Sequence, residues 1–151
     1  MSACAFLASD HPLPPVSPSR EYPVEVKLND GTVCDGGADD NFTLYPFAAV
    51  RDYTDKQYGV ALEWYPTPGR ALRILDYIRA ALQDTDVVEL WHVWLMGYYE
   101  YEERPVCHHY RTSLREITEK DIRELDGLAI WNHPDRRNPG RPSFYCLSIS
   151  C

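Results

Sequence analysis

The sequence predicts one α+β domain over residues 1–151, with a mostly antiparallel sheet of about six to seven strands, one main helix packed on a face and a second short helix. Residues 67–82 combine a helix cap with an apolar stripe of helical spacing. Residues 87–95 follow as the most apolar strand of the chain. The other apolar runs are short, alternate in polarity and are separated by turn residues, which is typical of antiparallel hairpins.

The main helix is expected over residues 68–83. Thr67 can cap its first turn, and Pro68 suits the first helical position because that position needs no amide hydrogen. The apolar stripe consists of Ala71, Ile74, Leu75, Ile78 and Leu82. Arg70 and the other charged residues of the helix are expected to lie mostly off this stripe. The strand at 87–95 is largely apolar on both faces, which predicts an interior strand that the helix covers on one side.

The N-terminal half predicts several short strands. Residues 3–8 form an apolar run, and residues 9–20 contain four prolines, which favour an extended connection. Residues 22–28 alternate in polarity and end at an Asn-Asp-Gly turn, which predicts a hairpin. Its apolar side chains are expected to face the core: Tyr22, Val24, Val26 and Leu28. Further strands are expected at 42–47 and 58–64.

The C-terminal third predicts a hairpin, a helix and a last strand. Residues 98–103 would extend the strand at 87–95, and residues 106–112 would return as its hairpin partner. Thr118 and Asp121 resemble a capping box, and Ile117 and Ile122 are spaced for a hydrophobic staple, so a second helix should begin there. Residues 144–149 are expected to form the last strand.

Charge and cysteine content limit the function classes. The net charge is −8, with −10 on residues 1–103 and +2 on residues 104–151. The acidic part would repel a nucleic acid backbone but is compatible with a basic protein partner. Solubility alone also explains an acidic surface. No apolar run is long enough for a membrane span, and the N-terminus lacks the features of a secretion signal. Five scattered cysteines without a Cys-x-x-Cys motif indicate reduced thiols in a cytoplasmic protein, and no cofactor is expected.

One candidate metal site lies in the glycine-rich loop at 35–41. Asp35, Asp39 and Asp40 supply carboxylates, which hard cations such as Ca²⁺ prefer. Their spacing does not match the twelve-residue calcium loop. The favoured alternative is a connection whose aspartates bind local backbone amides.

The candidate catalytic residues are His92, Glu89, His108 and His109. A histidine or glutamate in a central strand can act as a general acid or base when its pKa is shifted. His108 and His109 are neighbours on an expected strand, so they should point to opposite faces. No nucleophile or metalloprotease motif accompanies these residues, and structural roles are the commoner explanation.

The candidate binding surface is an acidic stretch that alternates tyrosine and glutamate: Tyr98, Tyr99, Glu100, Tyr101, Glu102 and Glu103. Tyrosine supplies contact area at interfaces, and the carboxylates suit a basic partner. The alternative is a solvated hairpin tip. We therefore expect a non-enzymatic binding module, with a small enzyme or metal-dependent protein as the alternative, having its site near residues 35–40 and a histidine.

Several segments are similar to those of a family of small uncharacterised bacterial proteins. They are ACAFLASD, DGGADDNF, YGVALEW, ELWHVWLMGYYEYEE, IWNHPD and RPSFYCL, and they span nearly the whole chain. The resemblance implies no activity, ligand or site residue. Small acidic α+β proteins of this size also include immunity proteins that neutralise toxins, which is a comparison by analogy alone.

Overall fold

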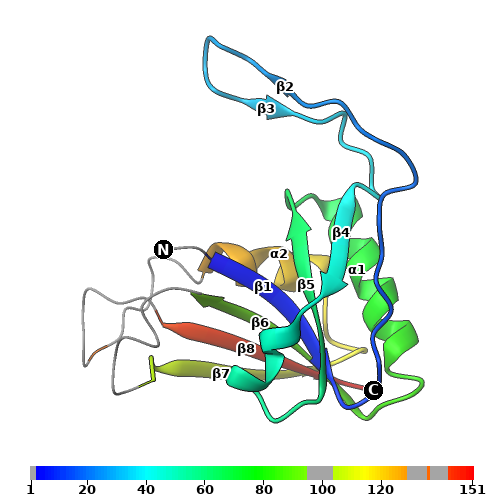
Figure 1. Cartoon of the computed structure of the whole chain (residues 1–151), viewed down its shortest axis with the longest axis vertical. Helices are drawn as coiled ribbons and strands as arrows, with labels where there is room; N and C mark the ends of the chain where they lie inside the picture. Colours follow the sequence, from blue (N-terminus) through cyan, green and yellow to red (C-terminus); the bar gives the residue numbers. More distant parts are fainter. Residues whose placement is uncertain (1–2, 95–103, 129–135, 137–142) are drawn as a thin grey trace.

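The computed structural model describes residues 3–94, 104–128, 136 and 143–151 (Figure 1). Its strands are β1 (Ala3–Ser9), β2 (Glu25–Val26), β3 (Val33–Cys34), β4 (Phe42–Pro46), β5 (Tyr58–Trp64), β6 (Val87–Trp94), β7 (Cys107–Ser113) and β8 (Phe144–Ser150). Its helices are the 3₁₀ helix η1 (Ala48–Asp52) and the α-helices α1 (Pro68–Ala81) and α2 (Glu119–Leu128).

The main sheet has six strands in the order β4-β5-β1-β6-β8-β7, and β2 pairs with β3 in a separate two-stranded sheet. All neighbours in the main sheet are antiparallel except β7 and β8, which are parallel. The predicted α+β class with a mostly antiparallel sheet is confirmed. So is the interior position of the strand predicted at 87–95, because β6 lies between β1 and β8.

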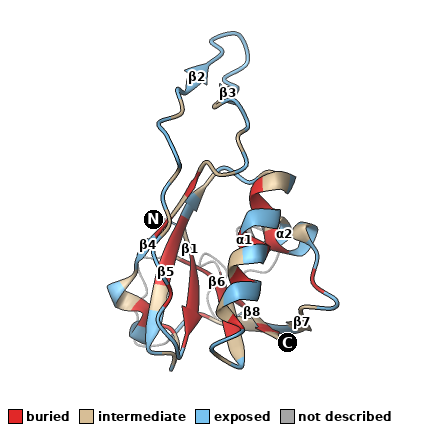
Figure 2. Cartoon of the chain, turned by 90° about the vertical axis from the view of Figure 1, so that its right-hand side faces the viewer, coloured by how far each residue is buried: buried red, intermediate tan, exposed pale blue. Residues whose placement is uncertain are grey.

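Both α-helices cover the same face of the main sheet (Figure 2). Ile74 and Ile78 of α1 and Ile122 of α2 are buried there against Leu7 and Leu90 of the sheet. Helix α1 begins as predicted, since Thr67 Oγ1 accepts a hydrogen bond from the Arg70 amide at 3.1 Å.

The cap predicted for α2 is also formed. The Thr118 amide donates to Asp121 Oδ2 at 2.8 Å, and the Asp121 amide donates back to Thr118 Oγ1 at 3.4 Å. Ile117 and Ile122, the residues predicted to staple the helix start, are both buried.

Aromatic rings pack on the opposite face of the sheet. Phe6 of β1 stacks on Trp91 of β6 with ring centroids 5.8 Å apart, and Tyr53 packs against both Phe6 and Phe144. Val50 of η1 belongs to the same cluster. The sheet is therefore covered on both sides, which explains why β1 and β6 are apolar on both faces.

The predicted hairpin between the strand at 87–95 and residues 106–112 is wrong. Strand β8 lies between β6 and β7, and β7 pairs with β8 in parallel. Burial explains this order. Five of the seven residues of β8 are buried, so it takes an interior position, whereas β7 contains exposed residues and lies at the edge.

The proline-rich segment 10–20 runs along the opposite edge of the sheet. Val16 forms two backbone hydrogen bonds of 2.9 Å with Leu44 of β4, and the Tyr77 hydroxyl of α1 donates to the Pro14 carbonyl at 2.7 Å. Leu13 of this segment is itself buried, and the antiparallel bridge at Val16 confirms the predicted extended connection. None of the helices in the described part of the chain is long and apolar enough to cross a membrane.

Candidate functional site

Strands β2 and β3 form a hairpin that projects from the rest of the molecule (Figure 1). We call residues 20–37, which include both strands and their turn, the arm. The Lys27 carbonyl accepts the Gly31 amide and the Lys27 amide donates to the Thr32 carbonyl, both at 2.8 Å. Gly31 has a φ of +71°, which favours glycine, so the predicted turn is confirmed although the paired strands are shorter than expected.

The predicted core-facing position of the arm's apolar side chains is wrong. Val24 and Val26 are each 57% exposed, Val33 is 44% exposed and Leu28 is 95% exposed. Val26 lies directly opposite Val33 across the hairpin, so their side chains share one face. Figure 2 shows this part of the chain as mostly exposed. Alternating polarity identified the strand, but it did not show that the apolar face lacks a layer above it.

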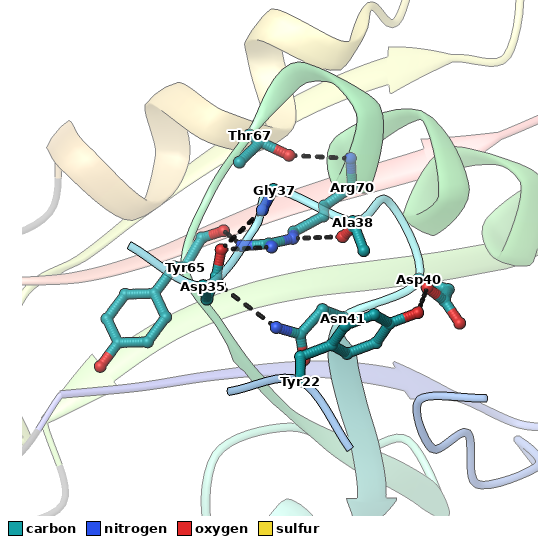
Figure 3. Close-up of polar contacts among 9 residues, drawn as sticks. All are labelled: Tyr22, Asp35, Gly37, Ala38, Asp40, Asn41, Tyr65, Thr67 and Arg70. Carbon is teal, nitrogen blue, oxygen red and sulfur yellow. Dashed lines mark hydrogen bonds and ion pairs between the residues drawn. The ribbon is translucent and has the colours of Figure 1, made fainter. Parts of the chain in front are cut away.

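A buried arginine of helix α1 anchors the end of the arm. Arg70 is only 1% exposed, and its guanidinium makes three hydrogen bonds of 2.9 Å (Figure 3). Nε donates to the Ala38 carbonyl, Nη1 to the Tyr65 carbonyl and Nη2 to Asp35 Oδ1. The expectation that Arg70 lies off the apolar stripe is therefore wrong. Its position four residues before Ile74 places it on the buried face, and that spacing was the available signal.

Both carboxylate oxygens of Asp35 accept hydrogen bonds. Its Oδ1 also accepts the Gly37 amide at 3.0 Å, and its Oδ2 accepts Asn41 Nδ2 at 3.2 Å. The hydrogen bond from Arg70 and the one from the Gly37 amide lower the pKa of this carboxyl group below its usual value. Asp35 therefore stays ionised at neutral pH and pairs the buried guanidinium charge.

A second set of contacts holds the segment that leads into the first strand of the arm. Asp40 Oδ2 accepts the Ser19 amide at 3.0 Å, and its Oδ1 accepts the Tyr22 hydroxyl (Figure 3). Hydrogen bonds from Ser19 and Tyr22 lower the pKa of the Asp40 carboxyl. The segment that enters the arm is thus bound to Asp40, in the same loop, residues 35–41, through which the chain leaves the arm.

Asp39 completes the contact between this loop and helix α1. Its carboxylate lies so close to Gly69 that a Cβ atom at Gly69 would overlap it. A negative charge at the first turn of a helix is favourable because the backbone dipoles leave partial positive charge there. The three aspartates of the predicted metal site therefore each contact a different set of groups. Within the described residues, no group of three His, Cys, Asp or Glu side chains could hold a metal ion.

The candidate catalytic residues are divided between the two faces of the sheet. His92 is 2% exposed on the helix-covered side, and burial lowers its pKa to about 4, so its imidazole is neutral at neutral pH. His108 stacks on Tyr145 with ring centroids 5.1 Å apart. On the other face, His109 lies edge-on to Trp91 at 6.0 Å.

Glu89 lies on the same face as His109 and has structural partners. Its Oε1 accepts the Thr54 hydroxyl at 2.6 Å and Trp91 Nε1 at 3.1 Å. These contacts tie β6 to the segment that follows η1. The structure thus brings His92 and His108 to one face and Glu89 and His109 to the other.

The predicted binding surface at residues 98–103 lies outside the described residues. No family model, curated protein or solved structure matches this chain. Within the described residues, the projecting arm is held at its base by the buried Arg70 and leaves apolar side chains exposed.

Proposed function

We propose that this protein is a binding module that engages a protein partner through the apolar face of the arm. The observation that carries the proposal is the exposure of Val24, Val26, Leu28 and Val33 on a hairpin that projects from the main sheet. Apolar side chains gathered on one exposed element are typical of interaction sites. A partner that covers them removes this surface from water.

The energetic gain from covering the arm is substantial. Full burial of a valine or leucine side chain contributes about 1.5–3 kcal/mol relative to leaving it exposed. A two-stranded hairpin is marginally stable on its own, so the same burial would also stabilise the pairing of β2 with β3. Leu28, the most exposed of the four, is the expected anchor of the interface.

The contacts at the base of the arm support a binding role because they preorganise it. Arg70 and Asp35 fix one end of the arm, and Asp40 holds Ser19 and Tyr22 at the other. A segment already held in position loses less conformational freedom when it binds. The buried Arg70–Asp35 pair therefore supports both the fold and the partner complex.

Charge indicates the kind of partner. The arm contains two basic and four acidic residues, for a net charge of −2, and the whole chain carries −8. Complementary charge speeds association and excludes like-charged partners. We infer a basic partner surface, and a cytoplasmic encounter fits the five free cysteine thiols.

The test compares capture by the wild type with capture by two variants in a lysate of the source cells. Leu28→Asp places a charge at the tip of the arm, whereas Leu72→Asp makes the same change on the exposed side of α1, where Leu72 is 51% exposed. Proteins held by the wild type and by Leu72→Asp, but lost with Leu28→Asp, are the expected result. Equal retention by both variants, or no specific capture by the wild type, would overturn the proposal.

A further inference from the structure

A cleft of about 410 Å³ lies where the arm joins the ends of β4 and β5. Its lining includes Tyr22 and Asp35 from the arm, Asn41 and three consecutive residues of β5 and its end, Glu63, Trp64 and Tyr65. We propose that this cleft receives the side chain of an arginine from the partner. This inference rests on the proposed binding function, because it identifies the chemistry of the residue that sits beside the arm.

The aromatic walls suit a guanidinium group. A planar cation is attracted to the face of an aromatic ring, and arginine stacks on such faces more readily than lysine. The chain already contains one such contact beside the cleft, because the Arg20 guanidinium carbon lies 5.1 Å from the centre of the Tyr22 ring. Arg20 lines the neighbouring cavity of about 400 Å³ and is not part of the cleft lining, where the exposed Tyr65 offers a further ring.

Tyr65 is placed to contribute its ring. Its backbone carbonyl faces Arg70, while its side chain extends away from the ion pair (Figure 3). The residue is 61% exposed although it is aromatic. A guanidinium stacked on this ring would cover surface that the chain itself leaves in contact with water.

The carboxylates of the cleft explain the choice of a cation. Asp35 is fully engaged, because its two oxygens accept from Arg70, the Gly37 amide and Asn41. Glu63 is exposed and has no ion-pair partner among the described residues. Its carboxylate can accept two parallel hydrogen bonds from one guanidinium, a geometry that a lysine ammonium does not provide.

The first test is a nuclear magnetic resonance titration of the intact chain with N-acetyl-arginine amide. The matched probe is N-acetyl-citrulline amide, which has nearly the same shape and no charge. We expect a saturable shift of the Trp64 indole signal, assigned with a Trp64→Phe variant, and a dissociation constant in the millimolar range. Citrulline should cause no saturable shift, and added salt should weaken arginine binding. Equal shifts from both probes, or none from arginine, would overturn the proposal.

Two variants with the same change in net charge distinguish arginine binding in the cleft from attraction by the overall charge of the protein. Glu63→Gln removes the carboxylate in the cleft, whereas Glu21→Gln removes an exposed acid of the arm that does not line it. Glu63→Gln should weaken arginine binding about fivefold, while Glu21→Gln should leave it nearly unchanged. Equal weakening by both would mean that the probe senses net charge alone, and the cleft would not be the site.

A third variant distinguishes this inference from the proposed function. Leu28→Asp alters the tip of the arm and should leave the arginine titration unchanged while it abolishes partner capture. Arm-dependent capture without arginine binding would overturn only the cleft assignment. Arginine binding without arm-dependent capture would overturn the binding function of the arm and leave the cleft as a cation site.

Discussion

Replacing Arg70 with methionine should destabilise the protein and release the arm. Methionine keeps most of the length of the arginine side chain but removes its charge and its donors. The change leaves Asp35 Oδ1 without its ion-pair partner, and it leaves the Ala38 and Tyr65 carbonyls without the hydrogen bonds they accept at 2.9 Å. The buried part of α1 and the loop at 35–41 would therefore contain several unsatisfied acceptors.

The expected loss follows from the burial of the pair. Removing one partner of a buried ion pair typically costs about 3–5 kcal/mol, because the remaining charge is left without compensation. The Asp35 side chain is 12% exposed and keeps its bonds from Gly37 and Asn41, so it can also recruit water. We therefore expect a loss of about 3 kcal/mol, at the lower end of that range.

Urea denaturation measures this loss, and Arg73→Met is the matched control. Arg73 lies on the exposed side of the same helix, so the identical substitution should change the free energy of unfolding by less than about 0.5 kcal/mol. Hydrogen exchange should show faster exchange in the arm of Arg70→Met, including the Lys27 amide, than in the main sheet. A loss below about 1 kcal/mol, or equal effects of both variants, would refute the anchoring role of Arg70.

Three further predictions concern the core and the titrating groups. Leu75→Ala should lower the free energy of unfolding by about 2–5 kcal/mol in urea melts, because Leu75 is buried, while Leu72→Ala on the exposed side should have little effect. The pKa values of Asp35 and Asp40 are lowered in the folded state, so the stability that they contribute is present above the unfolded pKa of about 4 and is lost as the pH falls below it. The protection factors of the arm amides, which correct for the intrinsic pH dependence of exchange, should fall first, and unchanged protection factors at pH 2.5 would contradict this. His92, with a pKa of about 4 in the fold against about 6.5 unfolded, should reduce stability by up to about 3 kcal/mol as the pH falls from 6.5 to 4, and an imidazole signal titrating near 6.5 would disprove it.

The main sheet and helices could be predicted because their signals are local. Thr67, the apolar stripe of α1 and the two-sided apolar character of β6 depend on residues near one another in sequence. The order of β7 and β8 could not be predicted in this way. It depends on which of two strands, far apart in sequence, takes the interior position of the sheet. Strand β8 is the more buried of the two and takes the interior position. No pattern within residues 106–112 indicates that another strand lies between them and β6.

The candidate site was harder to predict than the fold. Alternation from Val24 to Leu28 is the same whether the apolar face covers a core or remains exposed, because the pattern records two faces but not what lies above either. A charged residue on a helix is usually exposed, so Arg70 was misplaced despite its spacing from Ile74. Its burial depends on Asp35 and the carbonyls that surround it, which only the folded chain brings together.

Site-specific crosslinking from the tip of the arm tests the proposed binding function most directly. The photoreactive residue benzoylphenylalanine would replace Leu28 in one sample and Leu72 on α1 in another, both of which are exposed positions. After irradiation in a lysate of the source cells, position 28 should give a discrete covalent adduct that disappears when Arg70→Met releases the arm. Equal adducts from both positions, or none from position 28, would contradict the binding role of the arm.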